Sequence, residues 1–226
     1  LPWDYLPHLL AITITIPAII LFILGLFARI KLLLDRHSNK SDLVMAVWLF
    51  VPLLYVFIFH PSMYDNYRHF IFIIPPLFYF AGIALQFFFE KFSWLLQICL
   101  VLVVLLPGIF GIVKIHPYEY SYYNQLVGGL SGAAGNYEVD YWLTCYKDLT
   151  EQVNVREKTT RDIFVSFLPG LVNYYADERF HLYKANDPSY PEGSLLFLPI
   201  RRGYTSLFPE YPVEYSVVVD GIKLCN

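Results

Sequence analysis

A short polar segment, Phe59–His69, interrupts the apolar first half of the chain. Within it, Asp65 and Arg68 are three residues apart, and His69 follows directly. The planar guanidinium of an arginine offers paired N–H donors that match the oxygens of a phosphate. An Asp–Arg pair at this spacing could equally be a surface ion pair, which contributes little to stability. The segment is therefore a candidate phosphate-binding site, with a plain ion pair as the alternative.

The second candidate is the tyrosine-rich stretch His116–Asn124, which follows the last long apolar run and ends in Tyr123 and Asn124. Tyrosines at such a position are typical of an aromatic belt, in which the ring lies near the lipid headgroups and the hydroxyl lies in water. The functional alternative is a polar shelf above the membrane that contacts a sugar or a phosphate. Composition alone favours the belt.

Other motifs that would define a site are missing from the sequence. The glycine-rich run Gly128–Gly135 has neither the Gly-x-Gly-x-x-Gly nor the Walker spacing, so we interpret it as a flexible turn. No His-x-x-x-His or Cys-x-x-Cys pair predicts a zinc site. No local motif indicates Ser-His-Asp catalysis. The sequence therefore identifies neither a metal requirement nor a cofactor.

Long apolar runs surround the first polar segment. Hydrophobic residues make up 57% of the 226 residues and charged residues only 15%, which is too apolar for an ordinary soluble domain. A membrane-spanning helix needs about 20 apolar residues. Four uncharged runs approach that length, and they predict a multi-pass membrane protein with spans at 9–28, 43–59, 70–89 and 92–113.

Positive charge is concentrated in the loop after the first predicted span. That loop, 29–42, contains Arg29, Lys31, Arg36 and Lys40, whereas the loop after the second span has only Arg68. Loops rich in Lys and Arg remain in the cytoplasm. We therefore expect the 29–42 loop inside, and both Phe59–His69 and everything after Lys114 on the outer face of the cell membrane.

Several of the predicted spans contain proline. Neighbouring helices or hydroxyl groups must satisfy the carbonyls that a proline frees, so Pro17, Pro52 and the pair Pro75–Pro76 favour kinked helices packed as a four-helix transmembrane bundle. No predicted span has an internal Asp, Glu, Lys or Arg. The usual marker of a proton relay or an ion pathway is thus missing, which argues against a pump or an ion-coupled transporter.

The second half, 114–226, is acidic and less apolar, and we interpret it as a small α/β extracytoplasmic domain. Its pattern predicts a helix at 146–155 and strands at 162–167, 195–198 and 213–219, the last turning at Asp220–Gly221 into 222–224. Pro169–Gly170 is expected to end the first strand. The excess of acidic residues argues against nucleic-acid binding.

The chain has three cysteines. Cys99 falls in the fourth predicted span and is most simply a small apolar packing residue. Cys145 and Cys225 fall in the outer half, where an oxidising compartment would allow a disulfide. Nothing in the sequence brings these two together, so the question of a bridge stays open.

At these positions the chain resembles the multispan glycosyltransferases of the C fold class (GT-C), especially bacterial family 39 enzymes related to protein O-mannosyltransferases and lipid A aminoarabinose transferases. The similar stretches are ordered and cover most of the chain: Leu1–Tyr5 leading to Thr15–Pro17, Tyr67–Pro76, Tyr122–Gly129 through Gly135–Trp142, and Tyr215–Gly221. Family enzymes commonly have Asp-Tyr-Trp-Gly where this chain has Asp140-Tyr-Trp-Leu143, so the turn at that point is expected to differ.

The resemblance implies a transferase that takes a sugar from a polyprenyl-phosphate donor and passes it to an acceptor glycan, lipid or protein on the outer face. The four spans would be part of a larger GT-C bundle. In such enzymes the catalytic acidic residues lie in a first outer loop near the N-terminus, and this chain has no counterpart of that loop. We therefore expect a C-terminal portion that has no transferase activity by itself. Its substrate-binding candidates are Asp65, Tyr67, Arg68, His69, Tyr123 and Asn124.

Two other functions fit the same features. A non-enzymatic membrane subunit with an extracytoplasmic interaction domain ranks second, and half of a transporter ranks third. Paired acidic residues in an upstream outer loop would favour the enzyme, and their absence would favour the subunit. The sequence names neither the sugar, the acceptor nor the prenyl length.

Overall fold

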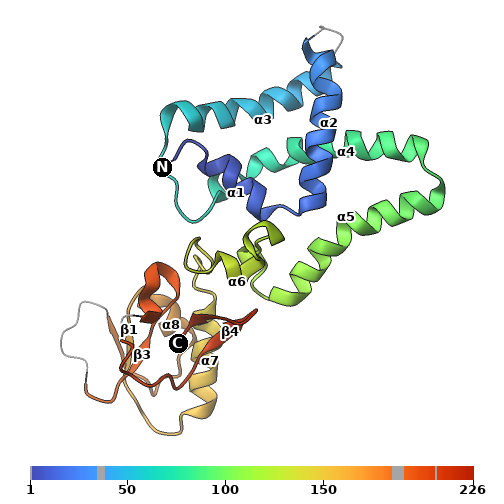
Figure 1. The fold of residues 1–226 in the computed structure, drawn as a ribbon. Coiled ribbons are helices and arrows are strands. Elements are labelled where there is room, and N and C mark those ends of the chain that lie inside the picture. The colour runs from blue at the N-terminus through green and yellow to red at the C-terminus, as the bar shows by residue number, and fades with distance from the viewer. Residues whose placement is uncertain (1, 35–38, 185–190, 207) are drawn as a thin grey trace. The chain divides into compact units, whose positions relative to one another are not determined.

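In a computed structural model, residues 2–34, 39–184, 191–206 and 208–226 are described. Helices dominate, and the strands lie in the second half of the chain (Figure 1). The chain divides into two compact units. The first comprises Leu1–Lys114 with Tyr123–Gly129, and the second comprises Ile115–Tyr122 with Leu130–Asn226. Each unit has its own buried core.

The first unit consists of apolar helices. Within the fully described residues, three segments are long and apolar enough to cross a membrane: Lys40–Phe59, Arg68–Lys91 and Trp94–Ile115. The stretch Ile16–Ile30, which is part of a longer helix, is also apolar. The elements are α1 (Tyr5–Thr13), α2 (Ile16–Leu34), α3 (Lys40–Phe59), the 3-10 helix η1 (Arg68–Ile73), α4 (Ile74–Lys91) and α5 (Trp94–Ile115). These helices are compatible with a membrane-embedded protein.

The first predicted span, 9–28, is wrong as a single helix, because the chain breaks between α1 and α2. Ile14 leaves the helical conformation and is extended, with φ −95° and ψ 147°. Pro17 has no N–H to donate to the Thr13 carbonyl, so an α-helical ladder cannot run through this point. After the break the apolar sequence continues as α2, a helix over Ile16–Leu34.

Asn124, from far along the sequence, provides the hydrogen bonds that the broken helix lacks. Its side-chain amide donates to the carbonyls of Ala11, at 2.7 Å, and Ile14, at 2.6 Å. Its backbone N–H donates to the Ile12 carbonyl at 2.8 Å. A buried carbonyl without a donor costs free energy, so this residue stabilises the break.

Pro75 and Pro76 lie at the start of α4 (Ile74–Lys91), not inside it as the sequence led us to expect. They occupy the first turn of the helix, directly after η1. The first N–H groups of a helix have no partner within the helix, so the missing donor of a proline costs nothing there. Pro52 and Pro107 do lie inside helices, in α3 and α5.

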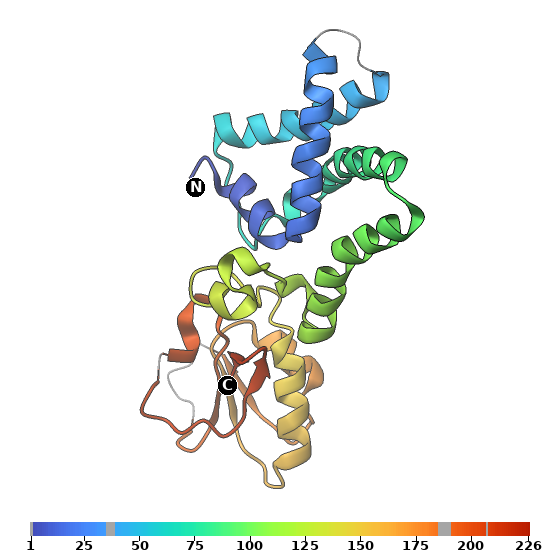
Figure 2. The same ribbon diagram turned by 45° about the vertical axis from the view of Figure 1, so that its right-hand side comes forward.

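The helices of the first unit pack most closely where α2 meets α4. A Cβ atom at Gly25 would overlap the backbone carbonyl oxygen of Phe80, so the two backbones touch there. The helices α2 and α3 cross at a wide angle in both views (Figures 1 and 2). Val104 of α5 packs against the buried cluster of Leu21, Ala81 and Ala84, while most of α5 is exposed. The packing therefore centres on the contact of α2 with α4 and not on a four-helix bundle.

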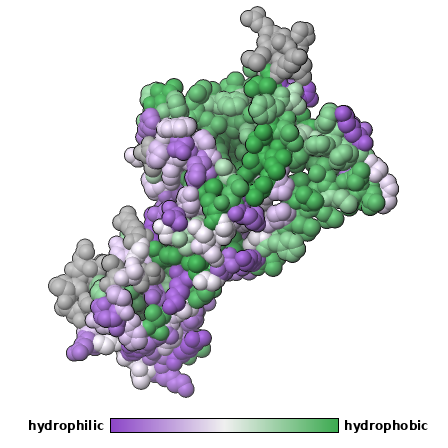
Figure 3. Space-filling view, viewed as in Figure 1, coloured by the Kyte–Doolittle hydropathy of each residue, from purple (hydrophilic) through white to green (hydrophobic). Residues whose placement is uncertain are grey.

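The first unit exposes much apolar surface. Phe59 on α3 and Phe110 on α5 are each about two-thirds exposed, at 67% and 66%. Hydrophobic residues cover much of the visible face of these helices (Figure 3). Soluble proteins rarely expose contiguous apolar surface of this kind, whereas lipid tails would cover it.

The second unit contains a three-stranded parallel sheet in the order β2-β1-β3. Its central strand β1 (Ile163–Val165) pairs with β2 (Leu182–Lys184) on one side and with β3 (Leu195–Phe197) on the other. The helices α7 (Cys145–Arg156) and α8 (Pro169–Tyr175) belong to the same unit. Tyr146, Leu149 and Val153 of α7 are fully buried, as is Ile163 of β1. This helix supplies a large part of the core.

A β-hairpin completes the second unit. Its strands β4 (Val217–Val219) and β5 (Ile222–Cys225) are antiparallel. Asp220 and Gly221 have left-handed φ values of 50° and 78°, which a two-residue turn of type I′ requires. Leu198 and Asn226 exchange backbone hydrogen bonds of 2.8 and 3.0 Å. The end of β5 is thus joined to the chain directly after β3.

Most of the elements predicted for the second half are confirmed at their centres. The helix at 146–155, the strands at 163–165 and 195–197, and the Asp220–Gly221 hairpin are all present. Three details differ. Only Val217–Val219 of the run 213–219 is a strand, Pro169–Gly170 begins the helix α8, and the run Gly128–Gly135 contains the short helix α6 (Gly129–Ala133).

Candidate functional site

The polar segment Phe59–His69 follows the end of α3 in the first unit. His60, Asp65 and Asn66 have left-handed backbone conformations, with φ of 45°, 56° and 64°. Asp and Asn adopt this conformation more readily than most residues. Asp65 and Asn66 are each only 7% exposed, although they lie in a loop. Two polar residues of this loop are therefore shielded from solvent.

Asp65 and Arg68 form an ion pair, with Arg68 Nη2 3.0 Å from Asp65 Oδ2. The Asp65 side chain is 8% exposed and the Arg68 side chain 26%. The guanidinium carbon of Arg68 lies 5.0 Å from the centre of the Tyr64 ring, and that ring meets the imidazole of His69 edge-on at 5.1 Å. We call Tyr64, Asp65, Arg68 and His69 the Arg68 cluster.

The Arg68 cluster differs from the plain surface ion pair that the sequence leaves open. A buried carboxylate has lost much of its hydration, so its counter-charge matters far more than in an exposed pair. Tyr64 is a member that the sequence analysis did not predict. Its position four residues before Arg68 was the available signal, because an aromatic ring near a guanidinium forms a cation–π contact.

Tyr67 has a different environment from its neighbours. Its backbone N–H donates to Asn66 Oδ1 at 2.8 Å, and its ring packs against the apolar core of the first unit. The residue therefore fixes the loop to the helices, while Asp65, Arg68 and His69 are brought together beside it.

Tyr123 and Asn124 are buried, at 3% and 0% exposure. Both N–H groups of the Asn124 amide are used at the helix break, and its Oδ1 accepts the Leu126 N–H at 2.9 Å. The structure thus gives Asn124 a clear structural role.

The tyrosines just before them stabilise the second unit. The Tyr118 hydroxyl donates to Asp148 Oδ2 at 2.6 Å, and the Tyr120 hydroxyl donates to Asp140. Asp140 in turn accepts the backbone N–H groups of Thr144, at 3.0 Å, and Cys145, at 3.2 Å, at the start of α7. Burial, reinforced by the neighbouring carboxylates, raises the pKa of both tyrosines above the usual value. Tyr118 and Tyr120 are therefore neutral structural donors.

A second buried ionic group in the first unit escaped the sequence analysis. Asp42, in the first turn of α3, is 1% exposed and accepts a hydrogen bond of 2.7 Å from the Tyr79 hydroxyl of α4. Arg29 Nε of α2 lies 3.8 Å from the same carboxylate. The sequence places Asp42 in a polar loop, whereas it belongs to a helix of spanning length and links three helices.

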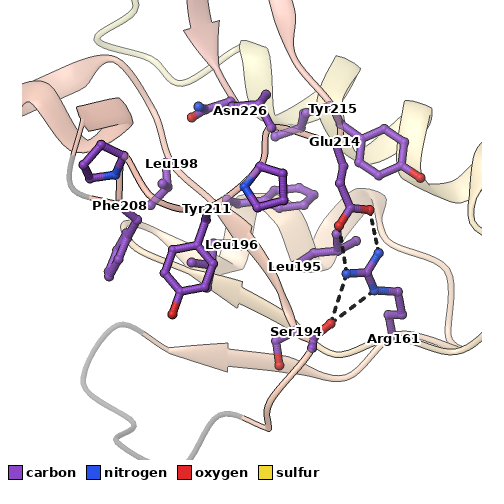
Figure 4. Close-up of a pocket in the computed structure, with 16 residues that line it drawn as sticks. Arg161, Ser194, Leu195, Leu196, Leu198, Phe208, Tyr211, Glu214, Tyr215 and Asn226 are labelled. Atoms are coloured by element: carbon purple, nitrogen blue, oxygen red, sulfur yellow. Dashed lines mark hydrogen bonds and ion pairs between the residues drawn. The ribbon is translucent and has the colours of Figure 1, made fainter.

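The second unit contains a cavity of about 290 Å³. Leucines of β3 and the following residues form one side of it, and aromatic residues of the segment Phe208–Tyr215 form the other (Figure 4). At one end, Arg161 donates two hydrogen bonds to Glu214, of 2.7 and 3.2 Å, and two to the Gly193 carbonyl. Hydrogen bonding from Arg161 lowers the pKa of Glu214.

No sequence pattern predicts this cavity. One side of the cavity is formed by β3. The other side is a segment without regular secondary structure, which sequence patterns do not predict. The cluster Pro209, Tyr211 and Pro212 was the one available signal, because prolines restrict the backbone and aromatic rings provide a large contact area. Apolar walls with few polar groups are typical of ligand pockets, although this cavity is at the small end of their range.

No group of three or more His, Cys, Asp or Glu side chains that could hold a metal ion occurs in the described part of the chain. Comparison of the sequence and structure with protein-family models, curated proteins and solved structures finds no match.

Proposed function

We propose that this chain is the C-terminal portion of a membrane glycosyltransferase of the GT-C class. Such an enzyme transfers a sugar from a polyprenyl-phosphate donor to an acceptor on the outer face of the membrane. The Arg68 cluster binds the donor phosphate in this proposal. The observation that carries it is a partly buried arginine, held by a buried aspartate and an aromatic ring, at the first residue of an apolar segment of spanning length.

The chemistry of the donor fits such a position. A polyprenyl tail remains among the lipids, so the phosphate lies at the end of the spans. A guanidinium can donate two parallel hydrogen bonds to phosphate oxygens, and charge-assisted bonds are roughly twice as strong as neutral ones. Asp65 and Tyr64 restrict the rotation of Arg68, so less conformational entropy is lost when the phosphate binds.

The first unit also offers a surface for the tail. Its helices expose large apolar side chains over much of their length. The second unit, with its cavity beside Arg161, would contact the acceptor. By itself the chain is expected to bind donor without transferring the sugar, since the resemblance places the catalytic acids in an upstream loop.

The second candidate is a non-enzymatic membrane subunit with an outer interaction domain. The cavity of the second unit favours it, because apolar and aromatic walls with one charged end suit a segment of a partner protein. The two candidates differ in ligand binding: the glycosyltransferase binds a polyprenyl phosphate, and the non-enzymatic subunit does not.

The test is donor binding by the chain in lipid nanodiscs, with undecaprenyl phosphate as the probe. Arg68→Lys keeps the charge and loses the planar fork, so we expect its affinity to fall about tenfold, in line with 1–3 kcal/mol for a hydrogen bond to a charged group. Arg68→Ala should bind the donor still more weakly. Undecaprenol lacks the phosphate, so wild type, Arg68→Lys and Arg68→Ala should bind it with equal affinity.

Lys91→Ala is the matched control. Lys91 is a cation near the other end of α4, with its Nζ 4.1 Å from the centre of the Phe87 ring. Its loss removes a charge and a cation–π contact from the same unit and should leave donor affinity unchanged. Equal affinities for wild type, Arg68→Lys and Arg68→Ala would refute the phosphate role.

A further inference from the structure

The structure brings together two cysteines that are far apart in the sequence. Cys145 is the first residue of α7 and Cys225 the last residue of β5. Both are fully buried, at 0% exposure, in the core of the second unit. The helix α7 contacts the strand β5, and each thiol shifts the pKa of the other, so the two side chains are neighbours; both are free thiols. The remaining cysteine, Cys99, lies on α5 in the first unit.

Backbone hydrogen bonds fix each cysteine in place. The N–H of Cys145 donates to Asp140 Oδ2 at 3.2 Å, and Tyr120 holds the same carboxylate. Cys225 lies between the hairpin turn and Asn226, whose backbone pairs with Leu198. Both cysteines therefore belong to ordered elements, a helix and a strand.

We infer that Cys145 and Cys225 form a disulfide that ties the start of α7 to the last strand of the second unit. In the folded protein, burial raises the pKa of both thiols, so little of the reactive thiolate is present there. The bond therefore forms during folding, before the core closes around the pair.

The oxidant is a small disulfide or a thiol–disulfide oxidoreductase of the outer compartment. One cysteine thiolate attacks a sulfur of that disulfide, which gives a mixed disulfide and releases one thiol. The second cysteine thiolate then displaces the other thiol. The two protein thiols thus lose two protons and two electrons, and the oxidant is reduced to two thiols.

This inference does not depend on sugar transfer. It requires that the second unit folds in an oxidising compartment, which agrees with the expected outer location. Because Leu198 and Asn226 both line the cavity and Asn226 follows Cys225 directly, the disulfide would also hold one wall of the cavity in place.

The experiment counts thiols on the full chain isolated from membranes. The protein is unfolded in guanidinium chloride with excess N-ethylmaleimide and without reductant, and its mass is measured. The chain has three cysteines. Without reductant we expect one N-ethylmaleimide adduct per chain, on Cys99. After prior reduction we expect three adducts. A digest should contain a peptide that joins Cys145 to Cys225. Three adducts without reductant would overturn the inference, and so would a crosslink that involves Cys99.

Variants separate a specific bridge from general oxidation. Cys225→Ala should leave Cys145 with no partner and give two adducts without reductant, whereas Cys99→Ala should give none. Reduction should lower the unfolding temperature of the second unit by about 10 °C in wild type and Cys99→Ala, as expected for loss of a long-loop disulfide. Reduction should not change the unfolding temperature of the double variant Cys145→Ala/Cys225→Ala. If the double variant fails to fold, the number of adducts on the wild-type protein still shows whether the disulfide is present. Donor binding is not measured in any of these assays, so the two proposals fail separately.

Discussion

Asp65 is the residue on which the Arg68 cluster depends. Its carboxylate is 8% exposed and faces a guanidinium that is 26% exposed. Asp65→Asn keeps the shape of the side chain but removes the carboxylate charge that faces Arg68. A fully buried pair broken in this way costs about 3–5 kcal/mol, and the partial exposure of Arg68 reduces this to about 2 kcal/mol. We expect a lower unfolding temperature for the chain in detergent, measured by circular dichroism.

Glu90→Gln is the control for this substitution. Glu90 is an exposed carboxylate of the same unit that accepts a hydrogen bond of 3.0 Å from Gln86. Its neutralisation should change the unfolding temperature by little, because exposed polar pairs contribute little. Equal shifts for the two variants would mean that Asp65 and Arg68 form an ordinary surface pair.

At this scale, the sequence predicts contacts between residues close in the chain and misses the distant ones. Asp65, Arg68 and His69 lie within about one turn, so their proximity follows from spacing alone. The bond from Tyr118 to Asp148, the contact of Cys145 with Cys225 and the three bonds from Asn124 join residues 30 to 113 positions apart. No local pattern encodes such pairs, because their geometry exists only after the elements have packed.

The α2–α4 contact is the feature of the helices most open to a direct test. Gly25 is the point of closest approach: an added Cβ would overlap the Phe80 carbonyl oxygen and lie 3.2 Å from the Ala84 nitrogen. Backbone atoms cannot move aside as a flexible side chain can, so Gly25→Ala must push the helices apart. Overpacking of this kind costs about 1–3 kcal/mol. We expect a lower unfolding temperature in detergent.

Gly82→Ala provides a matched comparison on the partner helix. A Cβ at Gly82 meets no atom within 4 Å, and alanine favours a helix over glycine by about 1 kcal/mol. This variant should be as stable as wild type or slightly more so. A Gly25→Ala protein as stable as Gly82→Ala would show that α2 and α4 do not touch at this point.

Hydropathy predicts helices well where the apolar run is continuous, as in α3 and α5. It fails at Ile14–Thr15, because both sides of the break are apolar and the interruption comes from the backbone chemistry of Pro17 together with the donors of Asn124. The strand β2 (Leu182–Lys184) was missed because it follows His181 and contains a lysine, whereas β1 and β3 lie in longer apolar runs.

Sidedness is the property of the whole molecule that the proposed function requires. Trypsin added outside intact spheroplasts should cleave the second unit, for instance at the exposed Lys158, and should spare the basic loop at 29–42, part of which lies outside the described residues. Permeabilised spheroplasts are the control, since the loop should then be cleaved as well. Cleavage of the loop and protection of the second unit in intact spheroplasts would reverse the topology and remove the basis for an outward-facing donor site.

The bonds from Asn124 to the broken helix have a consequence for biosynthesis. The carbonyls of Ala11, Ile12 and Ile14 are synthesised more than a hundred residues before the side chain that satisfies them. While the ribosome makes the intervening helices, these carbonyls must accept hydrogen bonds from water or from a temporary donor elsewhere. The first helices therefore reach their final form late, after the segment Tyr123–Gly129 has emerged and returned to them.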